Sequence, residues 1–343
     1  MRKLLNTLYV TSQDAFLALD GETVAIRREG ERPAHIPLHN LEGIVTFGYT
    51  GASPALMGAC AERGIALSFI SPSGKFLAEI CGNPQGNVIL RRTQYRTADD
   101  ESGSAAIAKN ILTGKLYNSR GVLDRAVRDH EARIDAKQVK NAARYISEAL
   151  KPLREATTLG ILRGVEGEAA MRYFDVFDEL ILQSKNDFAF SGRNRRPPTD
   201  KVNAMLSFAY TMLANECAAA LRSVGLDPYV GFLHRDRPGR KSLALDLMEE
   251  LRAVFADRFV LTLINTRQVG ASDFHIQENG AVKLRDDARR NFLTAWQNRK
   301  KEELQHPFLC EKINWGLVPY AQALLLARHL RGDLEEYPPF LWK

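Results

Sequence analysis

The chain changes character across the segment Arg91-Arg-Thr-Gln-Tyr-Arg-Thr-Ala-Asp-Asp-Glu-Ser-Gly-Ser104. Charged and small residues of this kind are typical of a linker between domains. Before the segment, apolar and β-branched residues alternate; after it, apolar residues recur at helical spacing. The sequence therefore predicts an α+β protein with a β-rich domain at 1–98 and a larger all-α domain at 99–343.

The β-rich half is expected to hold short strands separated by glycines. Their predicted ranges are 4–10, 15–19, 23–27, 41–47, 66–71 and 76–81. One helix should interrupt them, because Ser53 suits an N-cap, Pro54 suits the first helical position, and Gly64 suits the residue after the end.

The second half carries long stretches with helical periodicity. The expected helices are 105–116, 121–153, 167–182, 200–224, 242–255 and 318–330. The pair Asn279-Gly280 predicts a hairpin over 275–284, since this dipeptide favours a tight turn between strands.

Composition narrows the class of protein. The formal charge of +6 suits a polyanionic partner without requiring one. The cysteines are widely spaced, which indicates neither a disulfide framework nor a cysteine zinc site and favours a cytoplasmic location: Cys60, Cys81, Cys217 and Cys310. The first apolar run is too short for a signal peptide, and no stretch is long enough for a membrane span, so we expect no membrane association.

The densest group of candidate site residues lies at 225–249. It places His234 in a loop just before a helix for which Ser242 is a plausible N-cap. Asp246 and Glu249 stand three apart, so both should project from one helix face. The opposite stripe is apolar and should face a core: Leu243, Leu247 and Leu251.

Carboxylates brought together with one imidazole suit Mg²⁺ or Mn²⁺, because oxygen ligands favour hard cations. The alternative is that His234 packs or caps while the two acids form a solvated face.

A further acid, Glu166, lies between Gly164 and Gly167 and is expected at the start of a helix. The glycines would let a metal or a phosphate approach closely. The structural alternative is that an acid at a helix N-terminus is favoured by the helix dipole.

Two basic segments are candidates for gripping phosphates. The first is stiffened by Pro197-Pro198 and contains Arg193, Arg195, Arg196 and Lys201; the second surrounds His234 and contains Arg235, Arg237, Arg240 and Lys241. A basic run can equally be a solvated face.

Four motifs, taken in order, carry a family resemblance. They are Gly-Val-Glu166-Gly-x-Ala-Ala-x-x-Tyr173, Arg193-x-Arg195-Arg196-Pro-Pro-x-Asp200-x-x-Asn203, Leu-Asp-Pro-Tyr229-x-Gly-Phe-Leu-His234 and Ser-Leu-Ala-Leu-Asp246-Leu-Met-Glu249-x-x-Arg252. In this order they resemble the CRISPR-associated adaptation integrase family. The resemblance extends to Phe47-Gly48 and to the tail from Gly332 to Phe340.

The resemblance implies a metal-dependent DNA endonuclease and integrase that inserts spacer DNA into a CRISPR array by 3′-hydroxyl attack on a repeat phosphodiester. It implies a catalytic metal triad of Glu166, His234 and Glu249, with Mg²⁺ or Mn²⁺ as cofactor and Asp246 as a second acidic position near the metal. We expect double-stranded DNA, both the spacer fragment and the CRISPR repeat, to contact Arg193, Arg195, Arg196, Lys201, Arg237, Arg240, Lys241 and Arg252.

The resemblance also implies a homodimer formed through the β-rich domain, which pairs with a small second CRISPR-associated adaptation protein. Two alternatives belong to other functional classes. A non-catalytic DNA-binding scaffold would bind DNA without metal-dependent turnover. A small-molecule phosphoesterase would hydrolyse small esters and bind DNA weakly.

Overall fold

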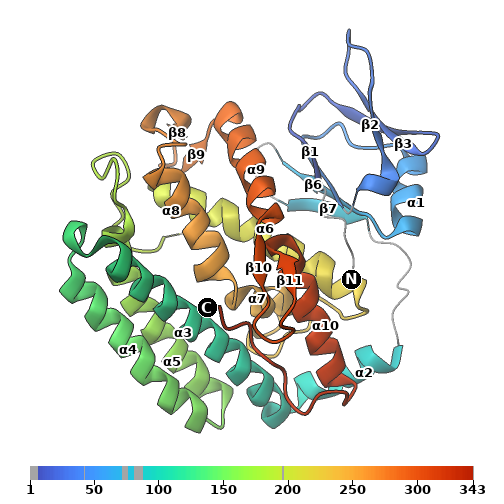
Figure 1. Cartoon of the computed structure of the whole chain (residues 1–343). Helices are drawn as coiled ribbons and strands as arrows, with labels where there is room; N and C mark the ends of the chain where they lie inside the picture. The colour runs from blue at the N-terminus through green and yellow to red at the C-terminus, as the bar shows by residue number, and fades with distance from the viewer. Residues whose placement is uncertain (1–6, 42, 72–75, 81–87, 195–196, 343) are drawn as a thin grey trace. The chain divides into compact units, whose positions relative to one another are not determined.

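The computed structural model describes residues 7–41, 43–71, 76–80, 88–194 and 197–342 (Figure 1). These residues form a mixed α+β structure, which confirms the predicted class. The chain divides into two compact units, Met1–Gln85 with Asp286–Glu302, and Gly86–Arg285 with Glu303–Lys343. The expected boundary near residue 98 therefore falls inside the second unit.

The first unit contains two sheets. One has the order β1 (Thr7–Val10), β5 (Gly43–Phe47), β6 (Ala66–Ile70) and β7 (Phe76–Ile80), with the first three parallel and β7 antiparallel. The other is an antiparallel meander of β2 (Phe16–Asp20), β3 (Thr23–Arg27) and β4 (Ala34–Pro37). All six expected strands are present within the described residues, and their positions 4–6, 42 and 81 lie outside those residues. The sequence analysis missed β4, an edge strand that ends in proline.

Helix α1 (Pro54–Arg63) links β5 to β6, and its predicted ends are confirmed. The Ser53 hydroxyl accepts a hydrogen bond from the Leu56 amide at 3.2 Å, and Gly64 is left-handed with φ 67°. The core of this unit consists of fully buried side chains from both sheets, from the turn after β4 and from α1: Leu17, Val24, Leu38, Ile44, Leu56 and Leu67.

Gly48 is required where the chain leaves β5. A Cβ at this position would lie 2.7 Å from the Gln13 carbonyl oxygen, and φ is +146°. Only glycine tolerates both conditions. The segment after Gly48 is hydrogen-bonded to β2: the Leu17 amide donates to the Gly51 oxygen at 3.2 Å.

Helix α9 (Asp286–Lys301) belongs to the first unit although it follows 200 residues of the second. Its Arg289 guanidinium lies over the Phe47 ring at 5.2 Å, and the Gln297 amide donates to the Thr7 oxygen at 3.2 Å. The sequence analysis did not predict this helix, despite acids in its first turn and bases in its last, which is a recognisable helix signature.

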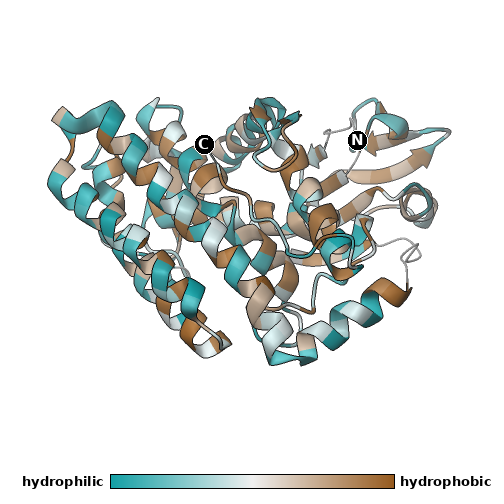
Figure 2. Cartoon of the chain, turned by 60° about the horizontal axis from the view of Figure 1, so that its bottom comes forward, coloured by the Kyte–Doolittle hydropathy of each residue, from teal (hydrophilic) through white to brown (hydrophobic). Residues whose placement is uncertain are grey.

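The second unit is mainly helical. Its helices are α2 (Val88–Asp99), α3 (Glu101–His130), α4 (Ala136–Glu155), α5 (Leu159–Asp175), α6 (Lys201–Ser223), α7 (Ser242–Glu249), α8 (Arg258–Asn265) and α10 (Val318–Leu330). Two short hairpins accompany them, β8 (Phe274–Ile276) with β9 (Val282–Leu284), and β10 (Glu303–Gln305) with β11 (Lys312–Asn314). Figure 2 shows hydrophilic and hydrophobic residues interleaved along the helices, as amphipathic helices require.

Several expectations for this unit need correction. The proposed linker is helical: it spans most of α2 and the start of α3, where Asp100 caps the helix by accepting from the Gly103 amide at 2.7 Å. The single helix expected over 121–153 is broken, because Asp135 starts α4 by accepting from the Gln138 amide at 3.0 Å.

The helix expected over 242–255 ends at Glu249 and is followed by η4 (Arg252–Asp257), a π-helical turn. The hairpin at 275–284 and the helix at 318–330 are confirmed.

The C-terminal tail is fastened to a buried acid, Glu250. The Tyr337 hydroxyl donates to one Glu250 oxygen at 2.5 Å, and the Phe340 amide and the Gln322 side chain donate to the other at 2.5 and 3.0 Å. Burial raises the pKa of Glu250 to about 8. The tail is thus hydrogen-bonded to the residue that directly follows Glu249.

Among the described residues, no helix combines the length and apolar character needed to cross a bilayer.

Candidate functional site

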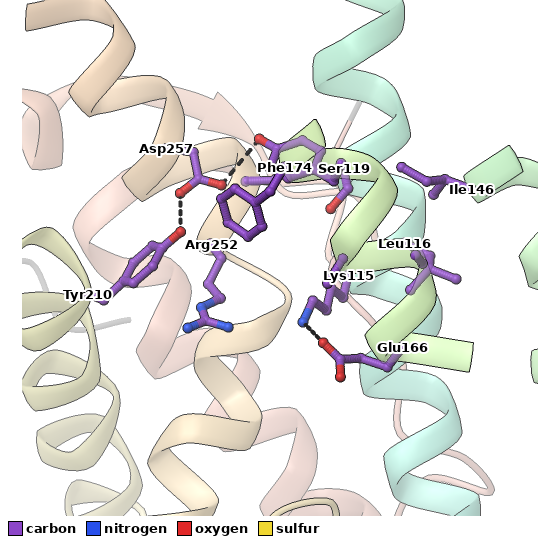
Figure 3. A pocket seen from close by; sticks show the side chains of 13 residues that line it. Lys115, Leu116, Ser119, Ile146, Glu166, Phe174, Tyr210, Arg252 and Asp257 are labelled. Atoms are coloured by element: carbon purple, nitrogen blue, oxygen red, sulfur yellow. Dashed lines mark hydrogen bonds and ion pairs between the residues drawn. The ribbon is translucent and has the colours of Figure 1, made fainter. Parts of the chain in front are cut away.

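Helices α3, α5 and α7 bring three charged side chains together in the second unit. The Lys115 ammonium of α3 lies 2.6 Å from a Glu249 oxygen of α7 and also pairs with Glu166 of α5. Figure 3 shows Lys115 pointing at Glu166 beside a cavity. The side chain of Glu249 is 5% exposed and that of Glu166 26%, so the group opens to solvent on the Glu166 side.

Glu166 does not start a helix, contrary to expectation. Helix α5 begins at Leu159, with Thr158 as its cap, so Glu166 lies about two turns inside it. The helix dipole acts within the first turn, which removes the structural reason offered for an acid here. A Cβ at Gly164 or Gly167 would meet no protein atom within 4 Å, so packing does not require these glycines.

The two acids of α7 are buried, which overturns the alternative of a solvated face. Asp246 is 0% exposed and Glu249 is 4% exposed. The apolar stripe is confirmed, since Leu243, Leu247 and Leu251 are all buried. Ser242 is not the N-cap. Lys241 takes that position, and the Ser242 hydroxyl donates to the Arg235 oxygen at 3.2 Å instead.

Asp246 organises the loop that carries His234. One of its oxygens accepts from the amides of Phe232 and Leu233 at 2.7 and 2.9 Å. The other accepts from the His234 amide at 3.0 Å and lies 2.6 Å from the His234 Nδ1. A carboxylate used in this way fixes the imidazole and leaves its Nε2 as the ring nitrogen for a further ligand.

The same loop is held from two other helices. From α5, the Arg163 guanidinium donates to the Leu233 oxygen at 2.6 and 2.9 Å. From α2, the Gln94 side chain donates to the oxygens of Asp227 and Val230 at 2.8 and 2.9 Å. The sequence analysis missed both residues. Arg163 could have been recognised, because it precedes Glu166 by three residues and so shares its helix face. Gln94 could not, because it lay in the supposed linker.

Gly231 is the one position in this loop where a side chain cannot fit. An added Cβ would lie 2.8 Å from an Asp246 oxygen and 2.9 Å from the Ser242 Cβ. The glycine therefore lets the loop lie directly on α7, which brings His234 within reach of Asp246.

Two buried acids in this region have pKa values shifted in opposite directions. Although burial opposes ionisation, Arg252 and Lys115 lower the pKa of Glu249 to about 2, and His234 contributes in the same sense. Arg252 lies 2.9 and 3.1 Å from the two Glu249 oxygens. Burial raises the pKa of Asp257 to about 6, against hydrogen bonds from Tyr210 at 2.5 Å and Tyr173 at 3.2 Å.

A cavity of about 70 Å³ adjoins the charged group. Its lining includes Lys115, Glu166, Tyr210, Arg252 and Asp257 (Figure 3). Arg252 and Asp257 both reach it because hydrogen bonds in a π-helix join residues five apart, which places these two on one side of η4.

The donor set suits a hard divalent cation, since it offers two carboxylates and one imidazole next to solvent. Within the described ranges, however, no three His, Cys, Asp or Glu side chains are arranged to hold a metal ion. The ammonium of Lys115 instead lies between Glu166 and Glu249. The chemistry of these residues fits a metal, while their present arrangement is closed around a lysine.

The basic residues fall into two groups. Arg193 is used within the protein: it bonds to Asn203 at 2.5 Å and Ser207 at 3.1 Å and stacks on Tyr210. Lys201 donates to the Asp187 oxygen at 2.9 Å. Arg195 and Arg196 lie outside the described residues.

The loop after His234 is more open. Arg235 and Arg237 are exposed. Arg240 bonds to Ser242 at 3.3 Å and Lys241 to Asn215 at 3.2 Å, both partly buried.

A family profile described as CRISPR associated protein Cas1 matches residues 8–298. The chain belongs to the Cas1 family. It is 49% identical to CRISPR-associated endonuclease Cas1 1 of Chlorobaculum tepidum and 52% identical to CRISPR-associated endonuclease Cas1 2 of Rhodospirillum rubrum, with complete coverage of both chains in each case.

Solved structures agree. A casposase bound to integration product is 25% identical, with a TM-score of 0.84 over 98% of this chain and 94% of that one. A chain of a Cas6-RT-Cas1–Cas2 complex shares the fold, with 23% identity and a TM-score of 0.83 over 100% of this chain and 36% of that one. The resemblance drawn from the four motifs is thus confirmed. As a Cas1 protein the chain is a CRISPR-adaptation endonuclease and integrase, which argues against the scaffold and phosphoesterase alternatives.

Proposed function

We propose that this Cas1 cuts and joins DNA at a centre where Glu166, His234 and Glu249 hold one Mg²⁺ or Mn²⁺. The observation that supports the proposal is that Glu166 of α5 and Glu249 of α7 both pair with the Lys115 ammonium, while the loop before α7 carries His234. Asp246 and Arg163 fix the loop between the two helices. His234 lies near enough to Glu249 to contribute to the lowered pKa of that acid.

When bound, the cation would withdraw charge from the scissile phosphate, as metal ions do in phosphoryl transfer. The protein's own residues have distinct tasks. Asp246 keeps the His234 ring oriented through Nδ1. Arg252 keeps Glu249 ionised although it is buried. The nucleophile is the 3′-hydroxyl of a DNA end in integration, or water in cleavage, and in-line displacement depends mainly on position and charge.

The DNA we propose is double-stranded, with the spacer fragment and the CRISPR repeat as the two substrates. The loop that follows His234 carries positive charge. Arg235 and Arg237 are exposed, and Arg240 and Lys241 are partly buried. Such contacts give salt-sensitive binding with little dependence on sequence. The likeness to a casposase bound to integration product supports a strand-joining role. We propose that Arg193 and Lys201 support the loop before α6 through their hydrogen bonds within the protein. We propose that Arg252 pairs with Glu249.

We further propose a homodimer formed through the first unit, because both of its sheets have edge strands that need covering. The family resemblance adds a small second CRISPR-associated protein as partner. A cytoplasmic location agrees with the free, buried thiols of Cys60 and Cys217, since secreted domains tend to use cysteine in disulfides.

The decisive experiment uses labelled duplex fragments, a supercoiled plasmid carrying the repeat, and Mg²⁺ or Mn²⁺. Glu166→Gln, His234→Ala and Glu249→Gln should each abolish strand joining, because each removes a ligand of one centre. Glu168→Gln is the matched control, since Glu168 is an exposed acid on the same helix as Glu166. Near-normal joining by any of the three variants would remove that residue from the centre, and full activity in excess EDTA would exclude the metal.

A further inference from the structure

Lys115 is a buried lysine at the middle of α3 that lies outside the four recognised motifs. Its residue is 8% exposed. Its ammonium lies 2.6 Å from Glu249 and also pairs with Glu166, so one cation joins the two carboxylates that we propose as metal ligands. A lysine placed in this way holds the position that a divalent cation would take between the same oxygens.

The charges of this group are already balanced. Two carboxylates, of Glu166 and Glu249, face two cations, the ammonium of Lys115 and the guanidinium of Arg252. A divalent ion added to this arrangement would leave excess positive charge beside the buried Glu249, where like charges repel strongly. The divalent ion and the Lys115 ammonium therefore compete for the same carboxylates.

The structure also gives Lys115 room to move. The adjoining cavity of about 70 Å³ is lined by Lys115 itself and by the oxygen-bearing side chains of Ser119, Tyr210 and Asp257 (Figure 3). Ser119 is four residues further along α3 and so lies on the same face. Lysine has a flexible four-carbon stem, so its ammonium can change direction without moving the helix.

We propose that Lys115 is a built-in counter-cation of the metal site: its ammonium holds Glu166 and Glu249 together until a divalent cation displaces it into the neighbouring cavity. This inference rests on the proposed metal centre. Lys115 acts as a positioning residue. It keeps the buried Glu249 and the partly exposed Glu166 together in the metal-free protein, and through competition it lowers the affinity for the metal.

The test is a calorimetric titration of the full-length, DNA-free protein with Mn²⁺. Lys115→Gln and Lys115→Met remove the competing charge. Both should bind Mn²⁺ about tenfold more tightly or better, because the metal then restores a broken buried ion pair. Lys115→Arg keeps the charge and should bind no more tightly than the wild type.

Lys109→Gln is the matched control, because Lys109 lies on the same helix but donates to the Arg154 oxygen at 2.9 Å, away from the carboxylates. Its Mn²⁺ affinity should equal that of the wild type. A second readout is thermal unfolding: without metal Lys115→Gln should melt below the wild type, and Mn²⁺ should raise its Tm by more than it raises that of the wild type.

Two failures can be told apart. If Glu249→Gln abolishes Mn²⁺ binding while Lys115→Gln and Lys115→Met bind with unchanged or weaker affinity, the counter-cation role is overturned and the metal centre stands. If Mn²⁺ binding is indifferent to both Glu166→Gln and Glu249→Gln, the metal centre itself is wrong and the inference fails with it.

Discussion

Asp246 shows how a single carboxylate can serve a site without being the group that reacts. Its two oxygens interact with three backbone amides and one imidazole nitrogen, all between 2.6 and 3.0 Å. Asn in its place would turn one of these oxygens into a donor facing another donor. We expect Asp246→Asn to weaken Mn²⁺ binding and strand joining by about 10–100-fold, in the range seen for residues that support a metal ligand.

The comparison variant is Asp236→Asn, which changes an exposed acid of the same loop and should leave both quantities unchanged. Complete loss of Mn²⁺ binding by Asp246→Asn in a folded protein would instead indicate that Asp246 is itself a ligand.

At this scale the sequence offered the acids and the histidine as candidates but did not point to the residues that hold them. Glu166, His234 and Glu249 stand in the motifs that carry the family resemblance, and this resemblance, rather than local spacing alone, made them candidates. Lys115, Arg163 and Gln94 act through contacts between residues 51 to 136 positions apart. Such contacts exist only after the helices have packed, and no local pattern in one sequence records them.

The C-terminal tail is hydrogen-bonded to the buried Glu250, and this contact should make the stability of the protein depend on pH. The pKa of this acid is raised to about 8 by burial, whereas its ordinary value is 4.5. The folded state therefore keeps a proton that the unfolded chain releases. The contribution to stability is fully present below pH 4.5 and is lost as the pH rises to about 8.

Glu250→Gln removes this titration, since the amide is neutral at every pH and the Tyr337 hydroxyl can accept as well as donate. The free energy of unfolding of the variant should exceed that of the wild type increasingly from pH 4.5 to 8, by up to a few kcal/mol (about 1.4 for each unit of pKa shift). Denaturant titrations at several pH values measure it. A constant difference across this range would mean that Glu250 is ionised in the folded protein.

Local caps were recognised for α1 but overlooked for α3 and α4, where Asp100 and Asp135 cap the helices, and elements defined by packing were not predicted. Ser53, Pro54 and Gly64 specify both ends of α1 locally, so the prediction was correct. The polar sequence of α2 resembled a linker. Its buried Gln94 hydrogen-bonds to a loop more than 130 residues away, and local sequence does not reveal this contact. The π-helical turn after Glu249 lacks any local signature, since it keeps the apolar spacing of a continuous helix.

For the whole molecule, the proposed homodimer can be tested on exposed apolar side chains of the first unit. Leu77 on the edge strand β7 is 42% exposed, and Tyr49 just after β5 is 77% exposed. If this unit forms the interface, Leu77→Glu combined with Tyr49→Arg should give a monomer in light scattering at micromolar concentration, because a buried unpaired charge is strongly unfavourable.

Ile276→Glu is the matched change in the second unit, where Ile276 is 75% exposed. It should leave the dimer intact. A double variant that stays dimeric, or an Ile276→Glu variant that dissociates, would place the interface in the helical unit.

The return of α9 to the first unit has a consequence for how this protein can be taken apart. The polypeptide passes between the units after Gln85, after Arg285 and after Glu302. After a single cut following Gln85, residues 1–85 keep no covalent connection and are held only by their packing against α9, which stays joined to the second unit at both ends. The first unit is also built from two segments that are far apart in the sequence. To exchange this unit between two relatives, both segments would have to be replaced together.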